Sequence, residues 1–308
     1  MLRSFPAGRL AALSAGDVPN DKGLTGTNRS VGHWLEAGPQ RGSCRGVVAA
    51  VAAGDLALAD RCWRGIEVAF AHQQPDGSFE AALRPNGESA RPYGAAVETA
   101  YFFLQELGRA VLVIRQSPHE AHFHARLMAI EPKMRRACEF ILGGYDTITA
   151  RSAKAVNRIF IAAKAFGLCG KALQEPRYLE ACRKLVKLGL TLRDKEGVFI
   201  EHGGRDSSYN VVSILMGQVL ALHVELPELE ESFHAAVAWQ LTKILPSGEI
   251  DVSGNTRTGV GKEKSYTGQP KNVNTNEIIY ALTLYGIVHD HAEALAAAER
   301  VARFYQKS

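Results

Sequence analysis

The stretch PDGSF at residues 75–79 recurs in altered form as KEGVF at 195–199 and as PSGEI at 246–250. Each copy follows an amphipathic run typical of a helix, and each has a glycine where a turn residue can take positive φ before a short extended segment. DKGLT at 21–25 and LGGYD at 142–146 extend the series. The spacing is roughly 50 to 65 residues, the length of a helical hairpin with its loops. The sequence therefore predicts repeated helical hairpins.

The helices between these turns are of two kinds. One kind is apolar around most of its circumference and is expected at 44–53, 92–107, 153–168, 207–223 and 275–288. The other kind carries charges on one face and is expected at 56–72, 119–142, 175–192, 227–245 and 292–305. A helix that is apolar all round is buried, whereas one with a charged face meets solvent. We therefore predict an all-α protein, an α/α toroid or incomplete barrel of about five to six hairpins with alternating inner and outer helices.

Composition limits the classes of function. The 308 residues, 46% hydrophobic, can bury a large core, and a net charge of +4 is too small to indicate a nucleic-acid binder. Five cysteines without CxxC pairing suggest neither a disulfide framework nor a zinc site, and no segment approaches the roughly 20 apolar residues of a membrane span. We expect a soluble, cytoplasmic protein without cofactor or metal that binds neither nucleic acid nor membrane.

The whole chain, 1–308, is predicted to be a single toroid domain. Residues 1–25 are expected to form an irregular N-terminal segment, and residues 251–271 a long loop rich in Gly, Ser, Thr and Lys. Loops of about 20 residues in compact domains are usually either functional or disordered. The loop is therefore expected either to fold over the site or to be disordered.

A resemblance supports the toroid. RGIEVAFAHQQPDGSF at residues 64–79 is similar to the QW-type repeat of terpenoid cyclases and their toroid relatives, in which Gln and an aromatic residue flank a DG turn. It covers one hairpin closely and two others loosely, and it implies the fold more than the activity. The DxDD and DDxxD acidic motifs of those cyclases are absent.

The predicted site takes its polar side chains from the first turns of the inner helices, which gather at one end of such a toroid. The catalytic candidates are Tyr209, His202, Arg205 and Asp206, and the substrate-binding candidates are Asn157, Arg158, Glu98, Tyr93, Asn276, Glu277, Arg257 and Trp34. Arginine presents a planar fork that fits carboxylate or phosphate, so the substrate is expected to be an anionic small molecule or glycan.

Structural explanations stand beside these functional ones. Asp206 can equally be a helix N-cap, and His202, next to two glycines, can be only a turn residue. Glu98, Asn157 and Arg158 are harder to explain structurally, because burying them in an apolar helix is costly without partners or a wet cavity. The histidines of HEAHFH at 119–124 are expected on a solvated outer helix rather than at a metal.

His, Tyr, Arg and Asn together suit β-elimination on a uronic acid, and toroid-fold polysaccharide lyases use such a set. Arg205, Asn157 and Arg158 would neutralise the substrate carboxylate, His202 or Tyr209 would remove the α-proton, and Tyr209 would protonate the leaving oxygen. No lyase motif is matched residue by residue. The predicted function is therefore a lyase that cleaves a uronic-acid-containing glycan.

Three alternatives remain open from the sequence. A glycoside hydrolase would use two carboxylates, for which Glu98, Asp206 and Glu277 are available. An isoprenoid cyclase or dehydratase-isomerase would follow from the QW-like repeat, and a non-catalytic toroid would bind a glycan without turnover. Substrate identity and oligomeric state are open as well.

Overall fold

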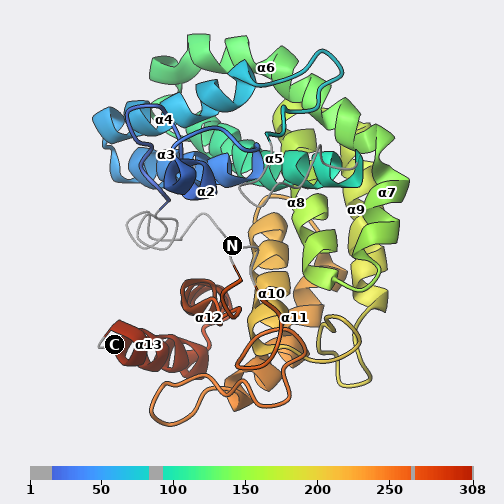
Figure 1. Ribbon diagram of the computed structural model, residues 1–308. Coiled ribbons are helices and arrows are strands. Elements are labelled where there is room, and N and C mark those ends of the chain that lie inside the picture. The colour runs from blue at the N-terminus through green and yellow to red at the C-terminus, as the bar shows by residue number, and fades with distance from the viewer. Residues whose placement is uncertain (1–15, 83–92, 265–267, 307–308) are drawn as a thin grey trace. The chain divides into compact units, whose positions relative to one another are not determined.

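The computed structural model describes residues 16–82, 93–264 and 268–306, and its regular structure in these ranges is helical (Figure 1). The more buried helices are α3 (Arg41–Ala53), α5 (Tyr93–Gln116), α8 (Val156–Leu173), α10 (Ser207–Ala221) and α12 (Thr275–Val288). The helices that alternate with them are α4 (Leu56–Ala71), α6 (Glu120–Gly143), α9 (Pro176–Thr191), α11 (Pro227–Thr242) and α13 (Ala292–Gln306). Two short helices, α2 (Gly26–Val31) and η2 (Gly38–Gln40), precede α3, and a third, α7 (Tyr145–Ser152), lies between α6 and α8. The predicted all-α class and the alternation of helices are confirmed.

One predicted helix end is wrong for a reason that the structure explains. The sequence predicts an end at 107, before Gly108, but α5 continues to Gln116. A Cβ at Gly108 would lie only 2.8 Å from the backbone nitrogen of Cys169 on α8. The glycine therefore lets two helices approach closely and does not end the first of them.

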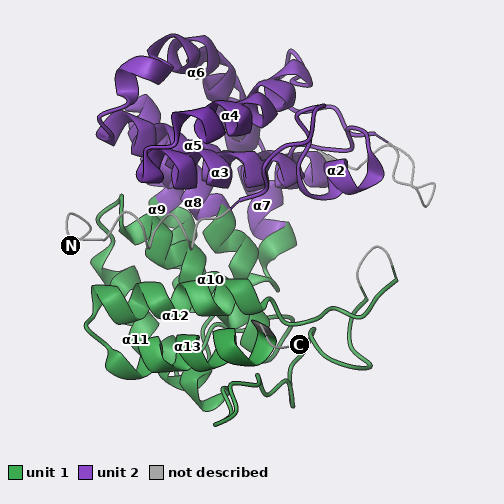
Figure 2. Ribbon diagram, turned by 90° about the vertical axis from the view of Figure 1, so that its left-hand side faces the viewer, with its two compact units in different colours: residues 1–4, 151–161, 183–308 green, residues 5–150, 162–182 purple. Residues whose placement is uncertain are grey.

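The chain divides into two compact units, shown in different colours in Figure 2. Among the described residues, unit 1 comprises 151–161 and the residues from 183 onward, and unit 2 comprises the residues up to 150 together with 162–182. Helices α8 and α9 contribute residues to both units. That all residues form a single domain stays a prediction.

Each unit has its own packing. In unit 2, α3 packs against α4 and α5, and α5 packs against α6. Phe70, Phe79 and Phe103 meet there at ring-centroid distances between 5.6 and 6.2 Å. In unit 1, α10 packs against α11 and α12, and α12 packs against α13. Nearly every residue of α10 is buried, as its apolar sequence predicts.

The repeated turns have one common backbone geometry. In PDGSF, Gln74 N donates to Ser78 O at 2.8 Å, and Gly77 takes φ 91°. In PSGEI, Leu245 N donates to Glu249 O at 2.9 Å, and Gly248 takes φ 94°. KEGVF and DKGLT repeat both features. The sequence therefore predicts the turn that defines the repeat correctly in these four copies.

The turn glycines also lie against the backbone of a following helix. A Cβ at Gly77 would lie 2.2 Å from the carbonyl oxygen of Arg136 on α6, and one at Gly248 would lie 2.1 Å from that of Arg300 on α13. Both the positive φ and the close approach exclude a side chain at these two positions. Each turn thus sets how closely a helix packs onto it.

The prediction for the fifth copy, LGGYD, is wrong. Helix α6 runs through Gly143, Gly144 comes after it with φ −91°, and α7 begins at the next residue, Tyr145. A pair of glycines predicts a turn, but neither takes positive φ here. The extra helix α7 occupies the place where an extended segment was expected.

Unit 2 buries a cluster of charges. Lys164 on α8 is fully buried and donates to Glu106 Oε1 at 2.9 Å and to Gln105 Oε1 at 2.6 Å on α5. Arg45 donates to Glu106 Oε1 at 3.1 Å, and Arg109 lies 3.8 Å from its Oε2. Burial lowers the pKa of Lys164 to about 8 despite its carboxylate partner. Burial alone would raise the pKa of Glu106, but the surrounding cations outweigh it and hold that pKa well below its usual range.

The five cysteines are all buried, and none of them forms a disulfide in the described structure. None of the helices in the described ranges is both long enough and apolar enough to cross a membrane.

Candidate functional site

Asp206 joins the start of α10 to the loop at 251–271. Its Oδ1 accepts from the backbone nitrogens of Ser208 at 3.0 Å and Tyr209 at 3.1 Å, as an N-cap does. Its Oδ2 accepts from the backbone nitrogens of Arg257 at 2.8 Å and Thr258 at 2.9 Å in the loop. The N-cap explanation of Asp206 is thus observed, and the same carboxylate holds the loop in place.

Asn255 strengthens this attachment. It is buried, accepts from Ser207 N at 2.9 Å and donates to Ser207 Oγ at 2.9 Å. It also donates to Thr258 Oγ1 at 2.6 Å, which closes the loop on itself. The described part of the loop is thus attached to the start of α10. That the loop covers a substrate site stays a prediction.

The docked loop brings two cations to the ring of Tyr209. The guanidinium carbon of Arg257 lies 4.0 Å from the ring centroid, and Lys271 Nζ lies 5.9 Å from it. Arg257 is buried whereas Tyr209 is half-buried. A phenol, which can donate or accept a proton, therefore stands beside two groups that attract anions.

Carboxylates complete the cluster. Arg257 pairs through Nη1 with Glu201 Oε1 and through Nε with Glu263 Oε2 at 3.1 Å. Lys271 Nζ lies 2.5 Å from the same Glu263 oxygen, and His202 Nδ1 lies 3.2 Å from the other one. Residues from the start of α10, the segment before it and the loop thus form one connected charge network in unit 1.

Glu201 is one of three groups in this network that the sequence analysis does not predict; the others are Glu263 and Lys271. Burial raises the pKa of Glu201 to about 7, although Arg257 and Arg158 act in the opposite direction. Within the described part of the chain, its Oε2 has no hydrogen-bond partner. A signal was present: Glu201 stands two residues after buried Phe199 in an extended stretch, where every second side chain points to the same side.

His202 has an unusual backbone. Its φ is 52°, and its nitrogen donates to Lys154 O at 2.6 Å. It is the turn residue that its neighbouring glycines suggest, yet its exposed ring also lies beside Glu263. Burial and the positive charge of Arg257 lower the pKa of His202, which favours the neutral ring that a base requires.

Arg205 lies away from this network. Its Nε is 2.5 Å from Asp194 Oδ2 and its Nη2 is 2.7 Å from Glu196 Oε2, both in the KEGVF turn region. Its guanidinium lies 5.6 Å from the Trp239 ring centroid. These contacts stabilise a turn, so the structure does not bring Arg205 to Tyr209.

Asn157 and Arg158 lie in the first turn of α8, next to the segment that carries Glu201. An antiparallel bridge joins Ala155 to Glu201. Asn157 is 6% exposed, and its Oδ1 has no hydrogen-bond partner among the described residues. Arg158 is half-buried and close enough to influence the pKa of Glu201.

None of the contacts given above joins the remaining candidates to this cluster. Asn276 is exposed and Glu277 is half-buried in the first turn of α12. Glu98 and Trp34 belong to unit 2, where the Trp34 ring stacks on His72 at 4.2 Å. Tyr93 is the first residue of α5, and its side chain lies outside the described ones.

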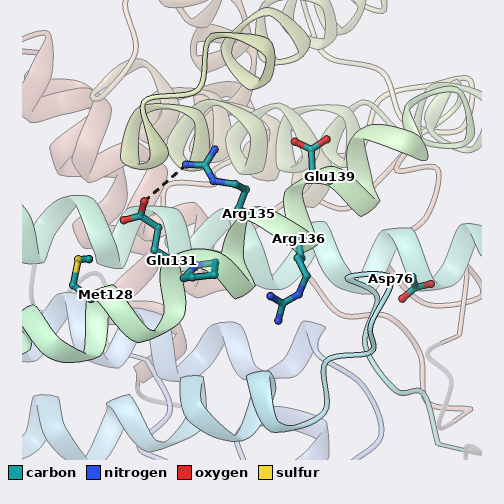
Figure 3. A pocket seen from close by; sticks show the side chains of 7 residues that line it. Asp76, Met128, Glu131, Arg135, Arg136 and Glu139 are labelled. Atoms are coloured by element: carbon teal, nitrogen blue, oxygen red, sulfur yellow. Dashed lines mark ion pairs between the residues drawn. The ribbon is translucent and has the colours of Figure 1, made fainter.

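A groove of about 540 Å³ follows α6 in unit 2 (Figure 3). It is lined by Asp76, Met128, Glu131, Pro132, Arg135, Arg136 and Glu139. Figure 3 shows Arg135 turned toward Glu131; it also pairs with Glu175 at 3.2 Å. Arg135 and Glu139 in this groove form ion pairs with neighbouring residues, and its lining includes no Tyr or His.

The HEAHFH stretch takes part in an ion-pair cluster on outer helices. His122 and Arg126 both contact Asp60 of α4, the former at 2.8 Å. Among the described residues, no three His, Cys, Asp or Glu side chains are grouped so that they could hold a metal ion.

Comparison with known proteins identifies the type of fold. No protein-family model and no curated protein matches the chain. A solved structure described as D-mannose isomerase is similar with a TM-score of 0.54 at 10% sequence identity, over 96% of this chain and 84% of that one. The likeness, with the helical hairpins described above, shows that the fold is an α/α toroid, as predicted.

Proposed function

We propose that the protein is a carbohydrate-active enzyme, and specifically a lyase that cleaves a uronic-acid-containing glycan by β-elimination. The observation that carries the proposal is the Tyr209 ring held against Arg257 and Lys271, with His202 and Glu263 in the same network. Proton-transfer groups and carboxylate-binding groups are thereby joined in one cluster. The fold neighbour is by its description a sugar isomerase, which supports a sugar substrate.

The contacts of these residues support a role for each. Arg257 and Lys271 bind the substrate carboxylate and withdraw negative charge, which makes the proton on the adjacent carbon more acidic. Neutral His202 removes that proton, and the Tyr209 phenol donates its own to the leaving glycosidic oxygen. Asp206 acts by positioning, because backbone donors occupy both of its oxygens. Arg205 also has no direct role, because its contacts lie at the KEGVF turn and not at Tyr209.

A sugar isomerase is a second candidate. The described activity of the fold neighbour favours it, and so does Glu201, whose raised pKa suits a group that removes and returns a proton near neutral pH. Isomerase and lyase share a first step, removal of a proton next to a carbonyl or carboxylate. They differ in whether a glycosidic bond then breaks.

The test follows ultraviolet absorbance of the protein with a panel of uronate-containing oligosaccharides, because elimination creates a C=C bond conjugated to the carboxylate. Tyr209→Phe is run beside Tyr178→Phe, whose phenol donates to Glu139 in unit 2 at 2.6 Å. A rise in absorbance that only Tyr209→Phe abolishes supports the lyase. No rise with any substrate, but ketose formed from D-mannose or another aldose, replaces the lyase with the isomerase.

A further inference from the structure

Glu201 combines deep burial with an incomplete set of partners. Its side chain is 1% exposed, and while Oε1 pairs with Arg257, Oε2 lacks a hydrogen-bond partner within the described ranges. A buried carboxylate oxygen without a donor is costly when ionised. The group is therefore held as an anion mainly by Arg257.

Arg257 is the residue to which the carboxylate of a substrate would bind. It is presented by the docked loop, its guanidinium covers the Tyr209 ring, and Glu263 accepts from its Nε. Glu201 occupies Nη1, a donor position that suits an incoming carboxylate. The side chain of Glu201 thus stands where the acidic group of a ligand would bind.

We propose that the carboxylate of the substrate replaces Glu201 on Arg257, and that Glu201 takes up one proton from solvent as it is displaced. The ligand brings one negative charge and the proton removes one, so the charge of the site is unchanged. The inference rests on the proposed function, because it requires a substrate that carries a carboxylate. Selection of an acidic sugar would then be coupled to proton uptake.

The surroundings of Glu201 agree with this exchange. Burial raises its pKa to about 7 even with Arg257 in place, and loss of that partner would raise the pKa further. The charged and titratable groups around Glu201 and its partner Arg257 are Arg158 of α8, His202 and Asp206 of the same segment, Tyr209 of α10, and Glu263 and Lys271 of the loop. His202 is the residue type among these that ordinarily titrates near neutral pH, and its ring is exposed.

Calorimetric titration tests the proposal with D-glucuronate and D-galacturonate in two buffers of different ionisation enthalpy, such as phosphate and Tris. At about pH 8 the wild type is expected to take up between half a proton and one proton per uronate bound, and its affinity should fall up to about tenfold per pH unit above 7. Glu201→Gln should bind at least as tightly, with no proton uptake and little pH dependence. Glu263→Gln, which removes the other carboxylate on Arg257, should keep the uptake.

Binding to the wild type without proton uptake would overturn the proposal, as would uptake that persists in Glu201→Gln or the absence of uronate binding. The wild-type measurement alone decides the point if Glu201→Gln does not fold. Turnover without proton-linked binding would overturn this inference and leave the lyase. Proton-linked binding without an unsaturated product would overturn the lyase and leave this inference.

Discussion

The guanidinium carbon of Arg257 lies 4.0 Å from the centre of the Tyr209 ring, so a loop residue covers one face of an aromatic ring in the first turn of α10. A cation over an aromatic face contributes about 0.5 to 2 kcal/mol, according to how far it is desolvated. The ring and the hydroxyl of Tyr209 therefore have separable contributions.

Substituting Tyr209 in two ways separates them. Tyr209→Phe keeps the ring under Arg257 and should leave the free energy of unfolding within about 0.5 kcal/mol of wild type, while turnover falls about 100- to 10,000-fold. Tyr209→Leu should lower both. Urea denaturation and the absorbance assay measure the two quantities; equal activity of Tyr209→Phe and wild type would remove the phenol from the mechanism.

Asp206→Ala should destabilise the protein by about 2 to 4 kcal/mol, because it removes a cap and two further charge-assisted bonds to backbone donors. It should also release the loop, so that trypsin cuts near Lys262. Asp55→Ala is the matched control, because Asp55 caps α4 and its side chain accepts, from the described residues, only the bond from Leu58 N at 2.9 Å. A loss of about 1 kcal/mol is therefore expected. Equal losses in the two variants would contradict a role for Asp206 in holding the loop.

Gly77→Ala and Gly248→Ala should each cost about 2 to 4 kcal/mol, since the added methyl group is strained by positive φ and overlaps a backbone carbonyl. Gly32 also has positive φ, 79°, but no described atom lies within 4 Å of the point that a Cβ there would occupy. Gly32→Ala should therefore cost only about 1 kcal/mol. Thermal melting of the three variants is the measurement, and a similar loss in all three would show that strain alone matters.

Stability should rise with pH between about 8 and 10.5 through Lys164. Its pKa is about 8 in the folded protein and 10.5 when unperturbed, so in this window the unfolded chain binds more protons. The contribution amounts to about 3 kcal/mol across the window. It is measured as the difference in unfolding free energy between wild type and Lys164→Met at each pH, and a difference that does not change with pH would show that Lys164 stays charged in both states.

The fold could be predicted from the sequence because its determinants are local. A positive-φ glycine after an amphipathic helix acts in the same way at Gly77 and Gly248. The turn predicted from the glycine pair in LGGYD was wrong, because a glycine only permits positive φ and does not require it. Which conformation the pair adopts depends on the next element of the chain, here the helix α7.

The candidate site could be predicted from the sequence only in part, because its contacts join segments that are far apart in the chain. Tyr209 and His202 stand where the start of an inner helix predicts polar side chains. Arg205, three residues beyond His202, was predicted to neutralise the substrate carboxylate. The structure instead pairs it with Asp194 and Glu196, which precede it in a turn. The importance of Glu201 depends on Arg257, which reaches it only when the loop is docked.

The shared carboxylate of Asp206 has a consequence for motion. Detaching the loop would remove the two backbone amides that donate to Oδ2, while Oδ1 would still accept hydrogen bonds from Ser208 N and Tyr209 N. A stranded oxygen of this kind makes partial detachment unfavourable, so the loop should come away as one cooperative unit. The amide protons of Arg257 and Thr258 would then exchange with deuterium at a common rate, and that rate would report how often the network around Tyr209 opens.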